Sequence, residues 1–458
     1  MAAAVSSHPL SLFPSLARAP TRAALARRAL LCAVLPLLAC SQPEPVAPPP
    51  ETDYDLAMAP PDLARMQPPP PPDLAPPRRP MYLNGSFDGG SSPFQSWVAT
   101  LTFARELLTT YKKPLHLTYF VTTAFYDTTV TGSIVGRAAS QDEILVRWAL
   151  TQQALNEGHE IANHTVRHLD GETWTAAQWR AELKEFQGLV VQNLFVPVLD
   201  EKMEPVFPRW RPLKDAAAGA VGAACSAAKD CQSGLSCAMV TPRTGFCTRE
   251  CNDIKPCPTG TFCGYPEEPE PDRDICLPKP EYPVMHQGQE LFFADGTPNL
   301  AHPALHPYVP VGFRAPQLST NDAMYQVLAE MHYAYDASQV DEPDLPYHQK
   351  SGTLEFSLMP FPGALAIPMD YNYMVHMDTD GSIMEKDYKN GILTCYEQRD
   401  RMPWNIGHHL RNYSGGAYFE TFKRVFRYAA QGCPDAKSVP HCPDIEFPSL
   451  RELNAHYR

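Results

Sequence analysis

The sequence lacks the features of a nucleic-acid-binding protein. Its 458 residues hold 38 Lys and Arg against 51 Asp and Glu, and the net charge is -13. Because phosphate binding needs concentrated positive charge, we expect no nucleic-acid partner. Long hydrophobic runs are missing as well, since the apolar run 29–39 is too short to span a bilayer. This run therefore cannot serve as a permanent transmembrane helix.

The run 29–39 has the size of the hydrophobic region of a signal peptide. It ends in Leu37-Leu38-Ala39-Cys40, which resembles the bacterial lipobox, and the resemblance implies that Cys40 becomes the lipidated first residue of the mature protein. We predict a lipoprotein signal peptide over 1–40, with export to the cell envelope and a lipid anchor in the membrane. Ser41 is not the Asp associated with inner-membrane retention, which favours the outer membrane. An ordinary secretory signal is the alternative.

Residues 41–80 are dominated by proline, with runs at 48–50 and 68–72. Such a segment cannot pack a core and favours the extended polyproline II conformation. Directly after a lipidation signal, it predicts a semi-rigid linker that holds a domain away from a membrane. A disordered tail without that role is the alternative.

From residue 81 the pattern changes to short apolar strands that alternate with amphipathic helices. We predict strands over 81–87, 115–121 and 159–162, and helices over 94–111 and 142–156. The first helix should bury one face, formed by Trp97, Leu101, Ala104 and Leu108. This alternation predicts βα units with a mainly parallel sheet.

Eight of the 13 cysteines lie in a stretch of low apolar content. They are Cys225, Cys231, Cys237, Cys247, Cys251, Cys257, Cys263 and Cys276. This density predicts a small module stapled by about four disulfides in an oxidising compartment. Zinc binding is the competing interpretation, but the cluster has no CxxC pair and the export signal disfavours it. The disulfide pairing among these eight cysteines stays open. Outside the cluster, Cys433 and Cys442 are expected to pair, which leaves Cys395 unpaired or bound elsewhere.

The strongest local motif is the string from Glu157 to His168. His164 and His168 are four residues apart, so on one face of a helical turn both imidazoles can reach one metal ion. The string resembles the second motif of the NodB-type polysaccharide deacetylases (carbohydrate esterase family 4), in which the two histidines bind the catalytic metal. The resemblance implies that His164 and His168 hold a divalent metal, for which we expect Zn²⁺.

The family's first motif, T-F-D-D, is similar to Ser86-Phe87-Asp88-Gly89-Gly90. The resemblance implies that Asp88 is the general base. Gly89 stands where the family has its metal-binding carboxylate, so the third ligand stays open between waters and another residue. A turn residue at the end of a strand is the alternative role for Asp88.

The third family motif, R-x-P-Y, is similar to Arg314-Ala315-Pro316-Gln317. By this resemblance Arg314 keeps the base carboxylate ionised and oriented, as a nearby fixed cation should. Gln317 replaces the usual Tyr, whose backbone N–H the family uses for the oxyanion.

The last motif should bring a histidine near the C-terminus, and Pro403 to Leu410 fits a strand that leads into a loop. By resemblance we choose His409 as the general acid, with His408 as the alternative. Asp370 is the candidate for the Asp that tunes this histidine.

The resemblance covers about residues 81–210 and 285–430. It implies an α/β fold, a distorted (β/α) barrel whose catalytic parts, 81–214 and 281–458, are separated by the inserted Cys-rich module, 215–280. The expected activity is metal-dependent hydrolysis of N-acetyl groups from a surface or extracellular polysaccharide partner, such as peptidoglycan, a chitin-like polymer or an exopolysaccharide. The alternative is a catalytically impaired, glycan-binding adhesion lipoprotein on the same fold.

Overall fold

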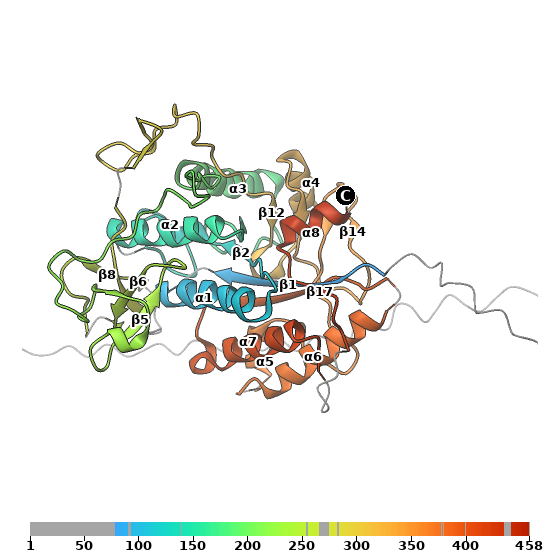
Figure 1. The fold of residues 1–458 in the computed structure, drawn as a ribbon. Helices are drawn as coiled ribbons and strands as arrows, with labels where there is room; N and C mark the ends of the chain where they lie inside the picture. Colours follow the sequence, from blue (N-terminus) through green and yellow to red (C-terminus); the bar gives the residue numbers. More distant parts are fainter. Residues whose placement is uncertain are drawn as a thin grey trace, which may run out of the picture. The chain divides into compact units, whose positions relative to one another are not determined.

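The computed structural model describes residues 78–89, 93–138, 140–252, 255–264, 274–281, 284–376, 378, 380–398, 400–434 and 441–457 (Figure 1). The predicted signal peptide with Cys40, and the linker up to residue 77, lie outside these residues. Within the described residues, every helix is too short or too polar to cross a membrane.

A mainly parallel sheet forms the centre of the described part of the chain (Figure 1). Its strands are β1 (Met81–Gly89), β2 (Thr118–Val121), β3 (Glu160–Asn163), β12 (Gly312–Phe313), β13 (Tyr335–Asp336), β14 (Tyr347–His348), β15 (Leu354–Glu355), β16 (Trp404–His409) and β17 (Ile445–Glu446). The order is β14-β15-β13-β12-β3-β2-β1-β16, with β17 also paired to β1. Among these pairs, β14 and β15 run antiparallel. The predicted βα organisation is therefore confirmed.

The sheet curls so that its two ends approach each other. The side chain of Asn405, in β16, donates a hydrogen bond of 3.3 Å to the carbonyl oxygen of Phe356, which follows β15. The indole N–H of Trp404 donates one of 3.1 Å to the carbonyl oxygen of Met359. These bonds join opposite ends of the strand order, which confirms the predicted distorted (β/α) barrel.

Helices cover the outside of the curled sheet (Figure 1). They are α1 (Phe94–Tyr111), α2 (Gln141–Asn156), α3 (Ala176–Asn193), α4 (Asp322–Glu330), α5 (Asp370–Val375), α6 (Ser382–Glu397), α7 (Ala417–Ala430) and α8 (Leu450–Tyr457). The predicted helix 94–111 has the observed bounds, but Leu108 was wrongly placed on its buried face. Leu108 is 51% exposed, and the buried stripe continues through Leu107 instead.

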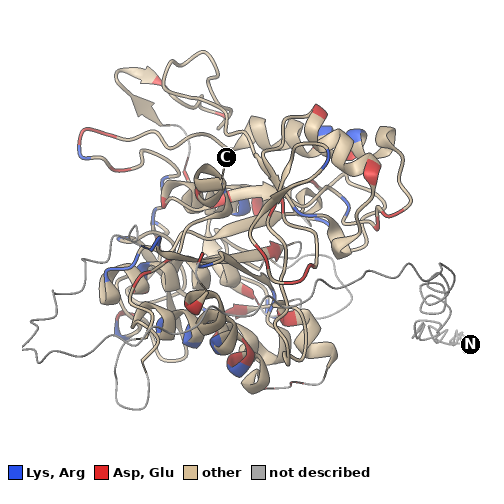
Figure 2. Ribbon diagram, turned by 90° about the vertical axis from the view of Figure 1, so that its right-hand side faces the viewer, with Lys and Arg blue, Asp and Glu red and all other residues tan. Residues whose placement is uncertain are grey.

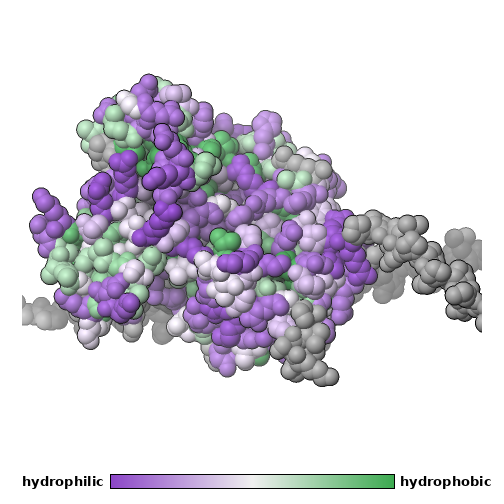
Figure 3. Space-filling view, in the orientation of Figure 1, coloured by the Kyte–Doolittle hydropathy of each residue, from purple (hydrophilic) through white to green (hydrophobic). Residues whose placement is uncertain are grey.

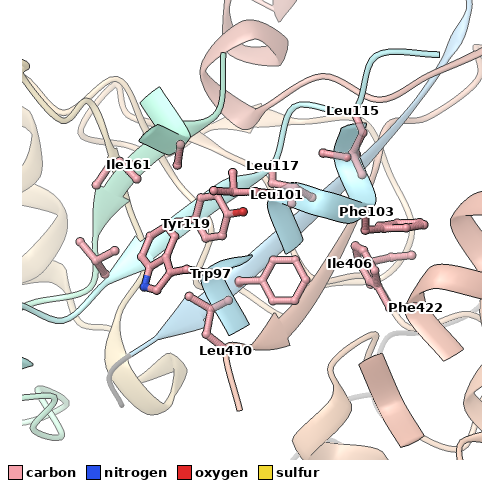
Figure 4. Close-up of a cluster of buried hydrophobic side chains, with 14 of the residues drawn as sticks. Trp97, Leu101, Phe103, Leu115, Leu117, Tyr119, Ile161, Ile406, Leu410 and Phe422 are labelled. Carbon is pink, nitrogen blue, oxygen red and sulfur yellow. The ribbon is translucent and has the colours of Figure 1, made fainter. Parts of the chain in front are cut away.

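Side-chain alternation along β1 directs apolar side chains to the outer face of the sheet and mainly polar side chains to its inner face. Leu83 and Phe87 point outward into the core shared with α1 and α7, part of which Figure 4 shows. The inner face of β1 carries the alternate side chains, those of Tyr82, Asn84, Ser86 and Asp88. The hydroxyl of Ser86 donates to the side chain of Asn405 inside the barrel. Because side chains alternate with a period of two, the outward apolar residues fix Asp88 facing inward at the carboxyl end of β1.

The Cys-rich segment forms two small three-stranded sheets. One consists of β4 (Ala224–Cys225), β6 (Gly245–Thr248) and β5 (Ser236–Met239), and the other of β7 (Glu250–Cys251), β9 (Asp274–Pro278) and β8 (Thr261–Cys263). The hairpin β10 (Met285–His286) and β11 (Gln289–Glu290) follows them.

The predicted disulfides are confirmed. The pairs are Cys225–Cys237, Cys231–Cys247, Cys251–Cys263, Cys257–Cys276 and, near the C-terminus, Cys433–Cys442. Cys395 is a buried free thiol.

Charges of both signs are interspersed over the described elements (Figure 2). The face seen in Figure 3 is mostly hydrophilic, with weakly hydrophobic side chains over the Cys-rich segment at its left.

Candidate active site

Four predicted site residues lie at the carboxyl ends of parallel strands. Asp88 is in β1 and His409 ends β16, whereas His164 directly follows β3 and Arg314 directly follows β12. Carboxyl ends of parallel strands meet at one edge of a sheet, where open α/β folds place their ligands. Asp88, His164, His168 and His409 line one cavity there, of about 500 Å³.

Asp88 and Arg314 form a buried ion pair. The Nη1 atom of Arg314 donates to Oδ1 of Asp88 over 2.6 Å, and the Nε atom donates to the carbonyl oxygen of Ala337 over 2.9 Å. The guanidinium also lies 4.2 Å from the ring centre of Phe120. Burial alone would raise the pKa of Asp88, but Arg314, with His164, lowers it below its ordinary value. Asp88 is therefore ionised at neutral pH, as a general base must be.

His409 is held by Asp370, the first residue of α5. Its Nδ1 lies 2.7 Å from Oδ1 of Asp370, and its backbone N–H donates to Oδ2 over 2.9 Å. A carboxylate only accepts, so Nδ1 carries a proton. Burial favours neutral His409, but the charge of Asp370 outweighs it and raises the pKa of His409. The histidine is thus biased towards the protonated form, which a general acid requires.

His408, the alternative acid, packs against the outer core, with its Nδ1 3.6 Å from Oδ2 of Asp370. Its ring packs 4.9 Å from that of Phe422 in the outer core, and its Nε2 lies 3.3 Å from the hydroxyl of Tyr388. Burial lowers the pKa of His408 to about 4, so it is neutral. His409, and not His408, lines the cavity with Asp88.

His164 and His168 lie close together, but on a loop rather than on the helical turn that their spacing suggested. The loop is held by Asn163, whose side chain accepts from the backbone N–H of Thr165 over 2.7 Å. Thr165 and His168 have φ angles of 65° and 57°, outside the helical region. The two rings are nevertheless 4.9 Å apart. The prediction of a helix was wrong here because a local Asx turn competes with helix formation.

Both rings suit a metal ion. Nδ1 of His164 donates to the carbonyl oxygen of Arg314 over 2.8 Å, which leaves the lone pair on Nε2. Nδ1 of His168 is buried without a hydrogen-bond partner. Burial lowers the pKa of His164, and lowers that of His168 to about 3, so both are neutral, the form that binds metals.

Among the described residues, no His, Cys, Asp or Glu joins His164 and His168 in a set of three with ligand atoms within 4.8 Å of one another. The sets of this kind that the described residues do form consist of disulfide-bonded cysteines. Gly89 lines the cavity without a side chain. The residues present thus fit a metal with two protein ligands, His164 and His168, and positions left for water or substrate.

Gln317, the residue expected to present its backbone N–H, also lines the cavity and has a φ of 57°. The segment before it is anchored from the neighbouring strand. Ser338 accepts from the backbone N–H of Ala315 over 2.7 Å and donates to Asp336 over 2.6 Å.

Two tyrosines of the cavity were missed in the sequence. The ring of Tyr371 lies 6.1 Å from that of His409, and the ring of Tyr413 lies 5.6 Å from it. Tyr371 follows Asp370 directly, so its position could have been inferred from the motif. Tyr413 lies on a turn after β16, and no sequence pattern marks it.

Part of the chain is similar to a known protein family. A family model described as polysaccharide deacetylase matches residues 79–197. No curated protein sequence matches the chain. Solved structures that match include a putative polysaccharide deacetylase from Mycobacterium smegmatis, which is 12% identical to this chain. The match covers 84% of this chain and 92% of that chain, with a TM-score of 0.40. A probable polysaccharide deacetylase from Pseudomonas aeruginosa PAO1 has 11% identity, 82% and 90% coverage and a TM-score of 0.41.

The matched segment contains Asp88, His164 and His168, and the fold is the distorted barrel expected of this family. Residues 79–197 are therefore similar to a polysaccharide deacetylase domain.

Proposed function

We propose that the protein hydrolyses N-acetyl groups of a surface or extracellular polysaccharide with the help of a divalent metal. One observation carries the proposal: a single cavity brings together an ionised carboxylate, Asp88, a histidine with a raised pKa, His409, and two neutral imidazoles.

Asp88 is assigned the role of general base. Arg314 keeps its carboxylate ionised, so it takes a proton as water adds to the carbonyl carbon of the acetyl group. The ion pair also fixes the direction of the carboxylate, because the guanidinium is itself anchored on the carbonyl oxygen of Ala337. Gln317 is assigned to the developing oxyanion through its backbone N–H.

His409 is assigned the role of general acid. Its Nδ1–H is bound by Asp370, so Nε2 is the nitrogen that gives a proton to the leaving sugar amine. The carbon–nitrogen bond then breaks, and the products are acetate and a free amine. Asp370 stabilises the imidazolium before this step and keeps the ring oriented during it.

His164 and His168 would hold the metal, for which we propose Zn²⁺, a common partner of two neutral imidazoles. When bound, the metal lowers the pKa of water and polarises the acetyl carbonyl. Because Gly89 offers no carboxylate, water or substrate would supply the remaining ligands.

The cavity volume of about 500 Å³ is in the range of small-molecule sites, and fits a sugar unit with its acetyl group. Tyr371 is 45% exposed and offers a ring face at the cavity. The five disulfides suit an oxidising compartment. Together with the lipobox-like string before Cys40 and the proline-rich linker, they support a lipid-anchored enzyme of the cell envelope, at the outer membrane.

Acetate release tests the proposal. Peptidoglycan, chitin oligomers and an N-acetylated exopolysaccharide are incubated with the wild-type protein, His164→Ala and the control Asp322→Asn, which changes an exposed carboxyl at the start of α4. We expect the wild type and the control to release acetate from one polymer, and His164→Ala to lose bound metal and activity together.

A glycan-binding protein with impaired catalysis is the second candidate, favoured by Gly89 at the position of the missing carboxylate. Polymer binding without acetate release, with metal supplied, would establish it and contradict the hydrolytic proposal.

A further inference from the structure

A side chain of the Cys-rich segment caps a helix of the catalytic domain. Asp274, the first residue of β9, accepts from the backbone N–H groups of Phe94 (3.1 Å) and Gln95 (3.0 Å), the first two residues of α1. The N-cap residue itself, Pro93, makes no side-chain hydrogen bond to the helix. The first N–H groups of a helix need outside partners, and here a carboxylate 180 residues later in the sequence supplies them.

Two arginines bind the same segment to the catalytic domain. Arg147 of α2, fully buried, donates to the carbonyl oxygen of Gly264 over 3.0 Å and to Glu143 over 2.6 Å. Arg105 of α1 donates to the carbonyl oxygen of Met239 over 2.7 Å. The Cys-rich segment therefore has polar contacts with both helices that flank β2.

Close packing surrounds the cap. A Cβ atom on Gly264 would clash with the carboxylate of Asp274 and with the ring of Phe94. The guanidinium of Arg147 lies 5.6 Å from the centre of that same ring. Asp274 is 1% exposed, so its two bonds to α1 are shielded from water.

Disulfides hold both contact points. Cys263 precedes Gly264, and Cys276 follows Asp274 by two residues. The two cysteines lie opposite each other in the neighbouring strands β8 and β9. Cys263 is bonded to Cys251, and Cys276 is bonded to Cys257. The cross-linked hairpin thus presents the Asp274 carboxylate from a covalently restrained backbone.

The first turn of α1 borders the active site. Gln95 and Ser96 line a cavity of about 210 Å³ whose walls also include Phe87 and His409. Phe87 precedes the proposed base Asp88, and His409 is the proposed acid. A shift of the first turn would therefore change the packing beside both groups.

We propose that Asp274 is a positioning residue for the deacetylase reaction: it fixes the first turn of α1 and, through it, the alignment of Asp88 with His409. The Cys-rich segment is then a structural part of the active site rather than a separate adhesion surface. The kinetic part of this inference rests on the proposed function.

The test compares Asp274→Ala and Asp274→Asn with the matched control Asp230→Ala. Asp230 also accepts from backbone N–H groups, those of Ser226 and Ala227, but it is exposed and bonds within the Cys-rich segment. Amide hydrogen exchange over residues 94–97 and the values of kcat and KM are measured on the full chain.

Asp274→Ala should speed exchange in the first turn of α1 by about tenfold, the usual effect of losing a cap. It should also lower kcat at least about threefold, with KM nearly unchanged because the binding cavity remains. Asp274→Asn, whose amide keeps one acceptor oxygen, should fall between Ala and wild type, which also provides a readout if the Ala variant does not fold. Asp230→Ala should keep wild-type exchange and kcat.

Wild-type exchange and kcat in folded Asp274→Ala would overturn the proposal, as would equal losses in Asp230→Ala. If the wild type releases no acetate, the proposed function fails, and the exchange measurement alone then decides whether Asp274 holds α1.

Discussion

Replacing Arg314 by Met tests the buried ion pair at the centre of the site. Arg314 is fully buried and Asp88 is 4% exposed, so the variant leaves a carboxylate in the interior without its bonded cation. Breaking a buried pair in this way costs about 3–5 kcal/mol. The lost bond to the carbonyl oxygen of Ala337 adds about 1 kcal/mol. We therefore expect the free energy of unfolding at pH 7 to fall by about 4–6 kcal/mol.

The pH dependence of this loss has a defined sign. In the wild type the pKa of Asp88 is lowered, so its contribution to stability is present above the unfolded pKa of about 3.9 and is lost only as pH falls through the folded value. In Arg314→Met, burial is left to raise the pKa of Asp88, so stability is lost as pH rises through that raised value. The difference between the two proteins should grow from pH 5 to pH 8.

Urea unfolding at pH 5, 6.5 and 8 measures the difference, and acetate release by the variant should shift to higher pH because its base ionises later. The double variant Asp88→Asn/Arg314→Met is the control, because it removes the stranded charge and should recover most of the stability. A loss of stability that is the same at every pH would show that Arg314 does not act through the charge of Asp88. So would a double variant whose loss equals the sum of the two single losses.

Three other changes test separate parts of the account. Asp370→Asn removes the charge that raises the pKa of His409. The alkaline limb of the pH profile of kcat should therefore move to lower pH, and kcat at pH 8 should fall about 100-fold. An unmoved limb would argue against His409 as the acid. Gly89→Asp adds a carboxylate to the cavity that holds the two histidines. Isothermal titration with Zn²⁺ should then show at least about tenfold tighter binding. An unchanged affinity for Zn²⁺ would place the metal elsewhere. Cys40→Ser should release the protein from membranes in fractionation, and continued membrane association would exclude the lipid anchor.

Sequence patterns predicted those parts of the fold that depend on local periodicity. The helix 94–111 follows from its apolar spacing, and period-two alternation along β1 and β16 accounts for the inward direction of Asp88 and His409. The choice between His408 and His409 stayed open in the sequence, and the structure places His409 in the cavity. Leu108 was misplaced because the spacing of apolar residues does not define where the packed surface ends.

Other features depend on contacts between distant segments and could not be predicted. The four-residue spacing of His164 and His168 suggested a helix, but Asn163 closes a turn that brings the rings together on a loop. The cap of α1 by Asp274 and the disulfide pairing join residues whose proximity is set by the tertiary structure. The roles assigned to the site residues stay predictions.

Comparing Asp88→Asn with the wild type tests whether Asp88 is the base of a metal-assisted deacetylation. Both proteins are loaded with Zn²⁺, their bound metal is quantified, and kcat for acetate release is measured on the preferred polymer. We expect equal metal content and a kcat lowered by about 10² to 10⁴, because only the proton acceptor is lost. A fully active Asp88→Asn with normal metal content would contradict it.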